Sequence, residues 1–291
     1  MIYKAADILK ECEEKKSSIG QLTREDEASS GALTAQQLDA NMKEVLAIMA
    51  DSSSLGLKKE VFSLSGMTGG SAKKLWNHRK EASLSGEFIL SAMARALSTS
   101  EVNASMGRIV AAPTAGASGI LPAALMSAKE KLSLNEDDLV LGLYTAGAVG
   151  KIVAISATIS GADGGCQAEC GTAAAMAAAA LVELMGGSPQ AAFHAASFAL
   201  IHIMGLVCDP IAGFVEFPCS LRNASGIVNA FISADLAMAG LTSPIPFDEV
   251  VEAMYQVGRM LPEALRETAL GGIAATPSAR ALEEKYLTKN K

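Results

Sequence analysis

The sequence is short of aromatic residues and of positive charge. Aromatic residues make up 4% of the 291-residue chain although hydrophobic residues make up 50%, so its apolar content is mainly Ala, Leu, Val, Ile and Met. Ala, Leu and Met are good helix formers. The formal net charge is −7, and the densest group of Lys and Arg, at residues 73–80, also suits a solvated loop. A nucleic-acid surface needs a basic patch, so we expect no nucleic-acid partner.

The sequence also lacks a secretory signal and a clear membrane span. Its N-terminus is charged and amphipathic, which is not the pattern of a signal peptide. The longest uncharged stretch, residues 184–208, contains several polar side chains, a proline and glycines, and no basic or aromatic belt flanks it. This pattern favours a buried helix over a membrane helix. We therefore expect a cytoplasmic protein without membrane contact.

The chain contains five cysteines, an odd number. Disulfide bonds are rare in cytoplasmic proteins, which leaves buried thiols, a nucleophile or metal ligands as alternatives. Cys12 lies on the apolar side of the first predicted helix and fits a buried thiol. The other four cysteines lie among turn-forming residues in segments 161–171 (GADGGCQAECG), 205–213 (GLVCDPIAG) and 216–224 (EFPCSLRNA).

These segments place Cys166, Cys208 and Cys219 at loops and helix starts. A thiolate at a helix start is favoured by the helix dipole and by free N–H groups, and this is the chemistry that a metal ligand needs. The spacing of the three cysteines matches no compact zinc or ferredoxin pattern. The pattern alone therefore names no metal, and a buried thiol remains the alternative for each cysteine taken singly.

The hydrophobic periodicity predicts helices along almost the whole chain. The pattern over residues 1–51 is helical, with a polar break at 26–30, a second helix over 34–50 and a further break at 52–56. A glycine-rich loop follows at residues 63–70. Further helices are predicted over residues 86–99, 119–130, 138–160, 171–186, 188–205, 222–240 and 247–269, the last kinked or split by Pro262, before a charged surface tail from Pro277. Repeats, linkers and alternating strand patterns are missing, so we predict a mainly α fold: a single, densely packed helical domain.

Residues 107–122, GRIVAAPTAGASGILP, resemble the signature segment of the iron–sulfur-dependent bacterial L-serine dehydratases. The three cysteine segments follow in that family's order and spacing. So does Glu267-Thr268 with Gly271-Gly272 near the C-terminus. The resemblance covers about residues 60–275 and implies that this part is the catalytic core, with residues 1–55 as a helical N-terminal segment.

The resemblance also implies a cofactor. In that family three cysteines hold a [4Fe–4S] cluster whose fourth iron is open, and by position these ligands are Cys166, Cys208 and Cys219. Cys170 stands where the family motif has a small apolar residue, so it is expected to be a packing cysteine. An open iron suits the elimination of water from L-serine, because as a Lewis acid it stabilises the charge that develops on the leaving hydroxyl.

The implied reaction is the dehydration and deamination of L-serine to pyruvate and ammonia, a step of amino-acid catabolism that feeds gluconeogenesis. Single-chain relatives carry an additional domain that this chain lacks, so the resemblance implies the α subunit of the two-chain type, a heterodimer with a β subunit. Alternatives are a related lyase such as L-cysteine desulfidase and a non-catalytic helical binding protein. Pyridoxal phosphate is the competing chemistry, but Lys151 better fits a helix residue whose charge reaches the surface.

Two glycine-rich loops are predicted to be active-site loops, because their hydroxyls and exposed amides suit a substrate carboxylate. His202, six residues before Cys208, is a candidate for proton transfer or for supporting the cluster, and His78 and Glu169 are weaker candidates for the base. With His202, the candidate catalytic residues are Ser65 and Thr68. The candidate substrate-binding residues are Gly69, Gly70, Thr114, Gly116, Ser118, Gly119, Arg222 and Asn223. A helix cap or a surface pair is the alternative for Arg222 and Asn223.

Overall fold

The computed structural model describes residues 4–31 and 33–287. Within these residues every regular element is helical, and β-type pairing is limited to two isolated bridges, Phe62–Gly69 and Cys208–Arg266. The α-helices are α1 (Ala5–Lys15), α2 (Ile19–Ser30), α3 (Ala35–Lys58), α4 (Ser71–His78), α5 (Gly86–Ala104), α6 (Ile120–Leu132), α7 (Glu136–Ser156), α8 (Gly161–Gly164), α9 (Thr172–Leu184), α10 (Pro189–His202), α11 (Cys219–Met238), α12 (Phe247–Met260) and α13 (Pro277–Leu287). The described residues also form one π-helical turn, η1 (Gln167–Gly171), and three 3-10 turns, η2 (Ile211–Gly213), η3 (Glu263–Leu265) and η4 (Gly272–Ala275). The mainly α fold expected from the sequence is confirmed.

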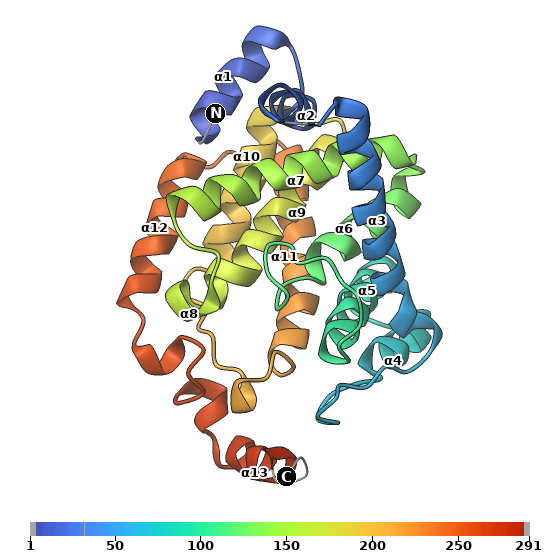
Figure 1. Ribbon diagram of the computed structural model, residues 1–291, viewed down its shortest axis with the longest axis vertical. Coiled ribbons are helices and arrows are strands. Elements are labelled where there is room, and N and C mark those ends of the chain that lie inside the picture. The colour runs from blue at the N-terminus through green and yellow to red at the C-terminus, as the bar shows by residue number, and fades with distance from the viewer. Residues whose placement is uncertain (1–3, 32, 288–291) are drawn as a thin grey trace.

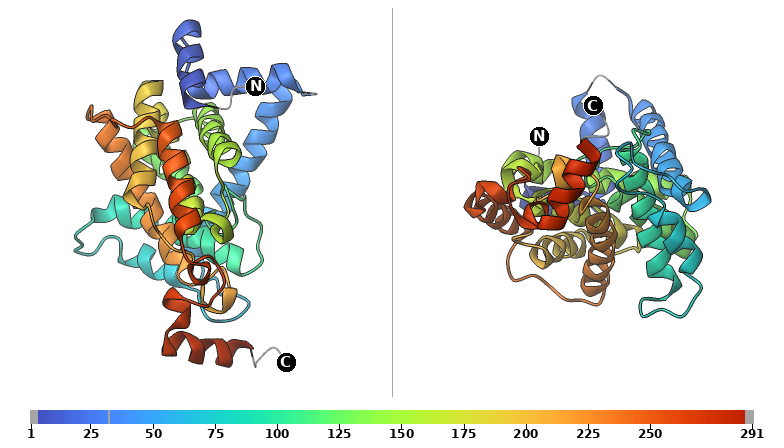
Figure 2. Two further views of the ribbon diagram at one scale, coloured as in Figure 1. Left: turned by 90° about the vertical axis from the view of Figure 1, so that its left-hand side faces the viewer. Right: turned by 90° about the horizontal axis from the view of Figure 1, so that it is seen from below.

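The helices form an elongated bundle with a clear difference between its two ends (Figure 1). Helices α9, α10 and α11 contact one another in the middle, and α7 crosses α9. Helices α1 and α2 lie at the upper end, whereas the loop before α11, the segment after α12 and helix α13 lie at the lower end (Figures 1 and 2). The three cysteine segments therefore lie away from the N-terminal helices.

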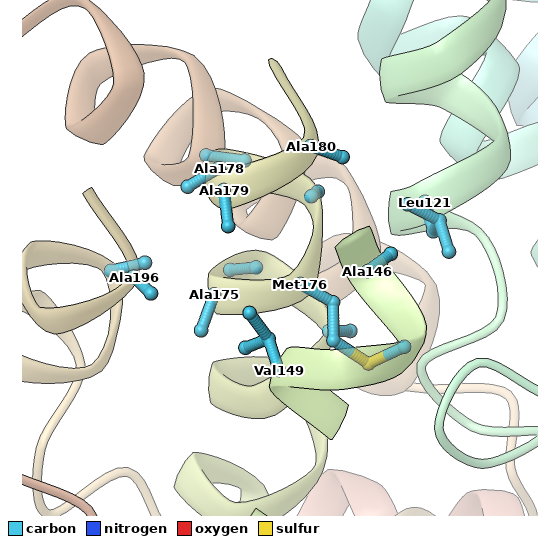
Figure 3. Packing of buried hydrophobic residues seen from close by; sticks show 14 of the residues in the cluster. Leu121, Ala146, Val149, Ala175, Met176, Ala178, Ala179, Ala180 and Ala196 are labelled. Atoms are coloured by element: carbon cyan, nitrogen blue, oxygen red, sulfur yellow. The ribbon is translucent and has the colours of Figure 1, made fainter. Parts of the chain in front are cut away.

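Helix α9 is the centre of the core because it is built almost entirely from small residues. Every residue from Thr172 to Val182 is buried, and α9 packs against α6, α7, α10 and α11 (Figure 3). Small side chains let helix axes approach closely. At Gly150 of α7, an added Cβ would lie 3.0 Å from the Met176 sulfur of α9. The dense packing of the alanine-rich segment, predicted from the sequence, is confirmed.

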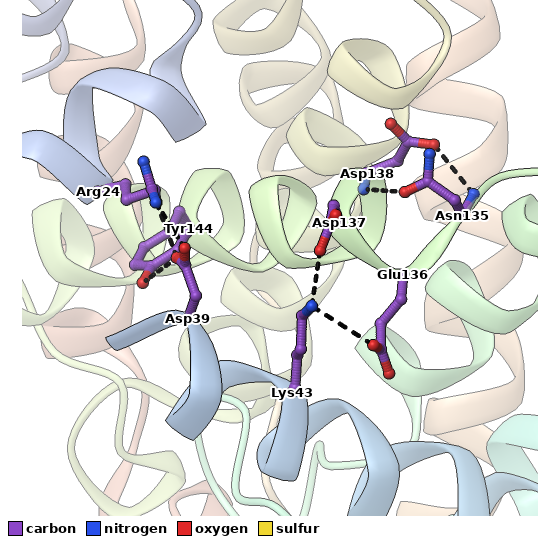
Figure 4. Close-up of polar contacts among 8 residues, drawn as sticks. All are labelled: Arg24, Asp39, Lys43, Asn135, Glu136, Asp137, Asp138 and Tyr144. Atoms are coloured by element: carbon purple, nitrogen blue, oxygen red, sulfur yellow. Dashed lines mark hydrogen bonds and ion pairs between the residues drawn. The ribbon is translucent and has the colours of Figure 1, made fainter. Parts of the chain in front are cut away.

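Helices α2, α3 and α7 are joined by charged and polar side chains (Figure 4). Arg24 of α2 pairs with Asp39 of α3 at 2.5 Å, and the Tyr144 hydroxyl of α7 donates to the same carboxylate at 3.3 Å. The hydrogen bond from Arg24 lowers the pKa of Asp39. Lys43 of α3 lies 2.8 Å from Asp137 in the first turn of α7. These contacts fix the N-terminal helices on the bundle.

Helix α1 is capped by a residue from the far end of the sequence. The backbone N–H groups of Ala5 and Ala6 donate to the two carboxylate oxygens of Asp248, at 2.9 and 3.2 Å. Asp248 itself lies in the first turn of α12. One carboxylate thus stabilises the N-termini of two helices, since free N–H groups and the helix dipole both favour negative charge there.

Two predicted helix breaks are wrong. Residues 26–30 lie inside α2. A capping box of Ser18 with Gln21 marks the start of α2, and one of Thr34 with Gln37 marks the start of α3, so the chain has no helix start at residues 26–30. Residues 52–56 lie inside α3, which continues to Lys58. The serine hydroxyls there bond back to the carbonyls of the preceding turn. Gly56 lets α3 approach α5, where an added Cβ would lie 3.0 Å from Ser98.

Other boundaries shift by a few residues, and two segments differ in kind. The stretch 184–208 is not one buried helix, because α9 ends at Leu184 and α10 runs from Pro189 to His202. Helix α12 ends at Met260, just before Pro262, and the charged tail forms the largely exposed helix α13. One described helix, α7, is long and apolar enough to span a membrane by length and composition alone, and 67% of that window is buried inside the protein.

Candidate active site at the cysteine segments

The three predicted ligand cysteines are held by different kinds of backbone. Cys166 directly precedes η1, which continues into α9, and Cys219 is the first residue of α11. Cys208 lies in the loop after α10, where its N–H donates to the Leu265 carbonyl at 2.9 Å and its own carbonyl accepts from the Glu267 N–H at 2.6 Å. All three side chains are buried. Two of the three thus occupy helix starts, as the sequence pattern predicts.

The cysteines lie close enough to influence one another's ionisation. Burial raises the pKa of Cys219 to about 12, and the charges of Cys166 and Glu169 add to the rise. Burial, and after it the charge of Cys166, raises the pKa of Cys208 as well. A hydrogen bond with Cys170 lowers the pKa of Cys166. The three predicted ligands therefore lie in one buried group, whose segments are joined by backbone hydrogen bonds from Gln167 to Leu206 and from Ile211 to Phe217, with Cys170 beside Cys166.

A notch at Gly161 borders this group. A Cβ added at Gly161 would lie 2.8 Å from the Cys208 Sγ, 2.8 Å from the Glu169 Oε2 and 3.4 Å from the Glu267 Oε2. The Thr114 hydroxyl donates to the Glu169 Oε1 at 2.6 Å. Burial raises the pKa of Glu169, and the hydrogen bond from Thr114 opposes that rise. The absence of a side chain thus lets the backbone at Gly161 lie directly against a thiol and two carboxylates.

Arg222 supplies the positive charge of the site. Its Nη2 lies 2.6 Å from the Asp209 Oδ1, and the Asp209 Oδ2 accepts from the Ile273 N–H at 2.6 Å. The Arg222 Nη1 is buried, and no residue in the described part of the chain accepts a hydrogen bond from it. Arg222 also opposes the raised pKa of Cys219. Arg222 therefore keeps one buried N–H donor without a partner near the cysteines.

Residues 113–119 are tied to α11 by Asn223. Its Nδ2 donates to the Gly116 carbonyl at 2.6 Å and to the Cys219 carbonyl at 2.9 Å, while its Oδ1 accepts from the Gly119 N–H at 2.8 Å. Gly116 faces Glu169, since an added Cβ there would lie 2.9 Å from its Oε1. Ser118 is fully buried and donates to the Ala115 carbonyl at 2.7 Å. Asn223 and Ser118 are therefore occupied by contacts within the protein.

The loop at residues 63–70 is organised by Glu216, a buried residue three positions before Cys219. The hydroxyls of Ser65 and Thr68 both donate to the Glu216 Oε2, each at 2.9 Å. The Ser65 oxygen also accepts from the Met67 N–H at 2.9 Å. With its proton given to Glu216, Ser65 has little capacity left for a substrate. Thr68 keeps its oxygen lone pairs free as acceptors.

Gly69 and Gly70 shape the same loop. Their φ angles are +146° and +70°, a region that side chains rarely adopt. A Cβ at Gly69 would lie 2.6 Å from the Phe62 Cα. Gly70 forms the N-cap of α4. The backbone geometry of this turn thus accounts for both glycines.

His202 is not brought to the cysteines. Its Nδ1 lies 2.7 Å from the Asn229 Oδ1 and 3.3 Å from the Ser233 hydroxyl, both on α11. Asn229 is ten residues beyond Cys219, which corresponds to ~15 Å along a helix. His78 is the exposed last residue of α4, and Lys151 pairs with Glu27 at 2.8 Å near the surface.

Sequence reasoning missed Asp209 and Glu216 as parts of the site and gave Glu267 no role. Each stands in or beside a motif that was recognised: Asp209 follows Cys208, Glu216 precedes Cys219, and Glu267 belongs to the C-terminal motif. Their partners, Arg222, Ser65 with Thr68, and the Gly161 notch, come from other segments. Proximity to the cysteines was the available signal, but the pairing depends on the fold.

The model of the family described as serine dehydratase alpha chain matches residues 13–274. The chain belongs to this family. It is 47% identical over 288 residues to the "L-serine dehydratase, alpha chain" of Peptoniphilus asaccharolyticus, which covers 99% of both chains. It is 52% identical over 251 residues to the "Probable L-serine dehydratase, alpha chain" of Bacillus subtilis (strain 168), covering 86% of this chain and 82% of that one. The family expected from the resemblance is confirmed.

Some serine dehydratases are longer. The "L-serine dehydratase TdcG" of Escherichia coli (strain K12) is 46% identical over 181 residues, which cover 62% of this chain but 40% of that protein. The match to the Peptoniphilus alpha chain extends over nearly the full length of both proteins. The chain therefore corresponds in extent to the separate alpha chains, in agreement with the two-chain type expected from the sequence.

The three cysteines are donors of the kind that hold an iron–sulfur cluster, whose ligands bind separate irons. Within residues 4–31 and 33–287, no group of three or more His, Cys, Asp or Glu side chains that could hold a metal ion is found. Three buried cysteines with raised or mutually shifted pKa values provide thiolates once a metal displaces their protons. The unpartnered Nη1 of Arg222 is a donor for an anionic sulfur or a substrate carboxylate.

Proposed function

We propose that this chain is the α subunit of an L-serine dehydratase, a lyase that converts L-serine to pyruvate and ammonia. The observation that carries the proposal is that the three segments with the buried Cys166, Cys208 and Cys219 are hydrogen-bonded to one another, near Glu169 and the unpartnered N–H of Arg222. The names of its relatives, which are L-serine dehydratase alpha chains, supply the reaction. The chemistry of the site is that of an elimination: an anion-binding group, a base and a place for a metal.

The proposed cofactor is a [4Fe–4S] cluster held by Cys166, Cys208 and Cys219. When bound, it supplies a Lewis acid for the serine hydroxyl through its open iron. Cys170 lies beside Cys166 without being a ligand. Its pKa is raised well above the usual value by the hydrogen bond with Cys166 and by burial, so it remains a neutral thiol that packs against the ligand.

The residues of the chain bind the substrate and move the proton. Arg222 binds the serine carboxylate through Nη1, and Asp209 fixes the guanidinium by holding Nη2. Glu169 takes the Cα proton at Oε2, while Thr114 orients the carboxylate by donating to Oε1. A carboxylate whose pKa is raised by burial is a better base at neutral pH than an ordinary one. After water has left, the enamine tautomerises to an imine, which water hydrolyses to pyruvate and ammonia.

This assignment replaces His202 as the base and reduces Ser65 to a residue that organises its loop. The His202 side chain is engaged by Asn229 of α11, whereas the Glu169 Oε2 borders the Gly161 notch. Thr68 remains a candidate for contact with the substrate, together with the amides of residues 114–119.

The chain is proposed to act in the cytoplasm with a separate β subunit, in amino-acid catabolism that feeds gluconeogenesis. The words "alpha chain" in the names of its relatives support the presence of a second, separate chain in the enzyme. Activity is therefore measured on the α chain co-expressed with its β chain.

The testing experiment is anaerobic purification followed by iron and sulfide analysis and assay of ammonia and pyruvate release. A [4Fe–4S] centre requires about four irons per α chain. Replacing Cys166, Cys208 or Cys219 with Ser should remove the iron, while Cys12→Ser, which changes a buried thiol of α1, should retain it. Full iron content in a ligand variant would refute its assignment. Faster ammonia release from L-cysteine than from L-serine would favour a cysteine desulfidase, and protein without iron or activity would favour a helical binding protein.

A further inference from the structure

Four acidic side chains surround the cysteine group, and three of them are already engaged by the protein. Asp209 accepts from Arg222 and from the Ile273 N–H. Glu216 accepts from two hydroxyls, and Glu169 accepts from Thr114.

Glu267 is different. In the part of the chain that the structure describes, its carboxylate receives no hydrogen bond and forms no ion pair, although its Oε2 lies 3.4 Å from the position that a Cβ of Gly161 would take. The site therefore contains one carboxylate whose acceptor capacity is unused.

The backbone holds this carboxylate against Cys208. The Glu267 N–H donates to the Cys208 carbonyl at 2.6 Å, and Cys208 forms its isolated bridge with the preceding residue, Arg266. The φ angle of Glu267 is +62°, in the left-handed region that favours glycine. A glycine would adopt this conformation with less strain, so the backbone does not explain why a glutamate stands here. Its side chain is half-buried and borders the notch.

The groups of an L-amino acid can be assigned to these side chains by charge. L-Serine carries a carboxylate, an ammonium and a hydroxyl. Arg222 is the site's cation and takes the carboxylate, and the base is Glu169. An ammonium needs an acceptor with negative charge, and Glu267 is the acidic side chain that is free to serve. Its charge also repels the substrate carboxylate and so fixes the orientation of the bound molecule.

We infer that Glu267 binds the α-ammonium group of the substrate at the Gly161 notch. The site thereby selects 2-amino acids and disfavours the corresponding molecules without an ammonium group. This inference rests on the proposed function, because it assumes that an amino acid binds beside the three cysteines. It assigns a role to a residue that the sequence motif identified only as part of a pattern.

The test compares two ligands that differ only at the ammonium group. L-Serine is the substrate, and 3-hydroxypropanoate, which has hydrogen in place of the ammonium, is used as an inhibitor of the complete α–β enzyme. Glu267→Gln keeps the size of the side chain and removes its charge. Glu267→Gly removes the side chain at a backbone position that glycine adopts readily, so a folded variant is available if the first is unstable. Glu263→Gln, an exposed residue of the same segment, is the matched control.

If Glu267 forms a hydrogen-bonded charge pair with the ammonium group, its replacement should weaken binding of L-serine but not of 3-hydroxypropanoate. Both Glu267 variants should raise the KM for L-serine about 10- to 100-fold and keep kcat within about threefold, since the contact is made in ground and transition states alike. The inhibition constant of 3-hydroxypropanoate should stay the same or fall, because a repelling charge has been removed. Iron content and the visible absorption of the cluster should equal those of the Glu263→Gln control.

Two results would overturn the inference. One is an equal rise in KM and in the inhibition constant, or no change in either, because Glu267 would then not recognise the ammonium. The other is loss of iron in the Glu267 variants, which would make the residue a support for Cys208. An unmodified α–β enzyme that fails to convert L-serine would instead refute the proposed function itself, so the two failures are distinguishable.

Discussion

The hydrogen bond between Thr114 and Glu169 offers a direct test of the proposed base. Thr114→Val keeps the shape of the side chain and removes the hydroxyl that donates to the Glu169 Oε1 at 2.6 Å. That hydroxyl favours the ionised carboxylate, so its loss raises the pKa of Glu169 above its already raised value. Glu169 acts as a base only when ionised. The acid side of the pH–rate profile should therefore move to higher pH.

The size of the shift follows from the strength of the bond. A hydrogen bond to a charged group contributes about 1.5–3 kcal/mol, and one pKa unit corresponds to about 1.4 kcal/mol. Because Glu169 is only partly shielded from solvent, we take the lower end of this range and expect a shift of about one pH unit. At a pH below the pKa, kcat/KM should fall about tenfold, while the plateau at high pH should change by less than about threefold.

The assay is kcat/KM for L-serine between about pH 5.5 and 9.5, measured anaerobically on the α–β enzyme. Thr145→Val is the matched control, because Thr145 donates to the Glu183 carboxylate at 2.7 Å in a buried position away from the cysteines. It should lower the melting temperature and leave the pH profile in place. An unmoved acid limb in Thr114→Val, or an equal loss at every pH, would refute Glu169 as the base.

Three further predictions concern other parts of the molecule. Asp209→Asn weakens the support of Arg222 and should raise the KM for L-serine about tenfold at unchanged iron content; steady-state kinetics with iron analysis checks this, and an unchanged KM would contradict the role of Arg222. Ala177→Leu, at a fully buried position of α9, should destabilise the protein by about 1–3 kcal/mol, measured by thermal melting; an unchanged melting temperature would mean that the core is looser than its packing indicates. In air, activity should fall faster than total iron, and L-serine should slow the loss because a ligand stabilises the form that it binds; activity that persists while a [3Fe–4S] signal grows would argue against catalysis at an open iron.

The helices could be predicted because they depend on local information, and the cysteine segments could be recognised for the same reason. The alanine-rich run of α9 has one favourable conformation, and cysteines beside Gly, Pro and Asp stand out in any sequence. The prediction of a helix break at the polar residues 26–30 was wrong, because tertiary contacts of α2 outweigh their low helix propensity. The capping boxes at Ser18 and Thr34 were visible in the sequence and would have placed the helix starts correctly.

The polar part of the site was harder to predict because it is assembled across segments. His202 stands six residues before Cys208, yet its side chain bonds to Asn229 of α11. Glu267 follows Cys208 by more than fifty residues and still shares a backbone hydrogen bond with it. Separation in the sequence therefore did not indicate proximity in the fold, either for His202 or for Glu267. Charge and burial decide the roles of these residues, and both become known only when the loops are placed.

The cap that Asp248 provides for α1 has a consequence for the order in which the protein is made. Helix α1 leaves the ribosome first, but the carboxylate that binds its first N–H groups lies 243 residues later in the chain. At about 5–20 residues per second, synthesis of the intervening chain takes roughly 10–50 s. During this time the N-terminal helix has no cap, although it also packs on α2 and α10. A nascent chain that stops short of α12 therefore leaves the first N–H groups of its first helix without this acceptor.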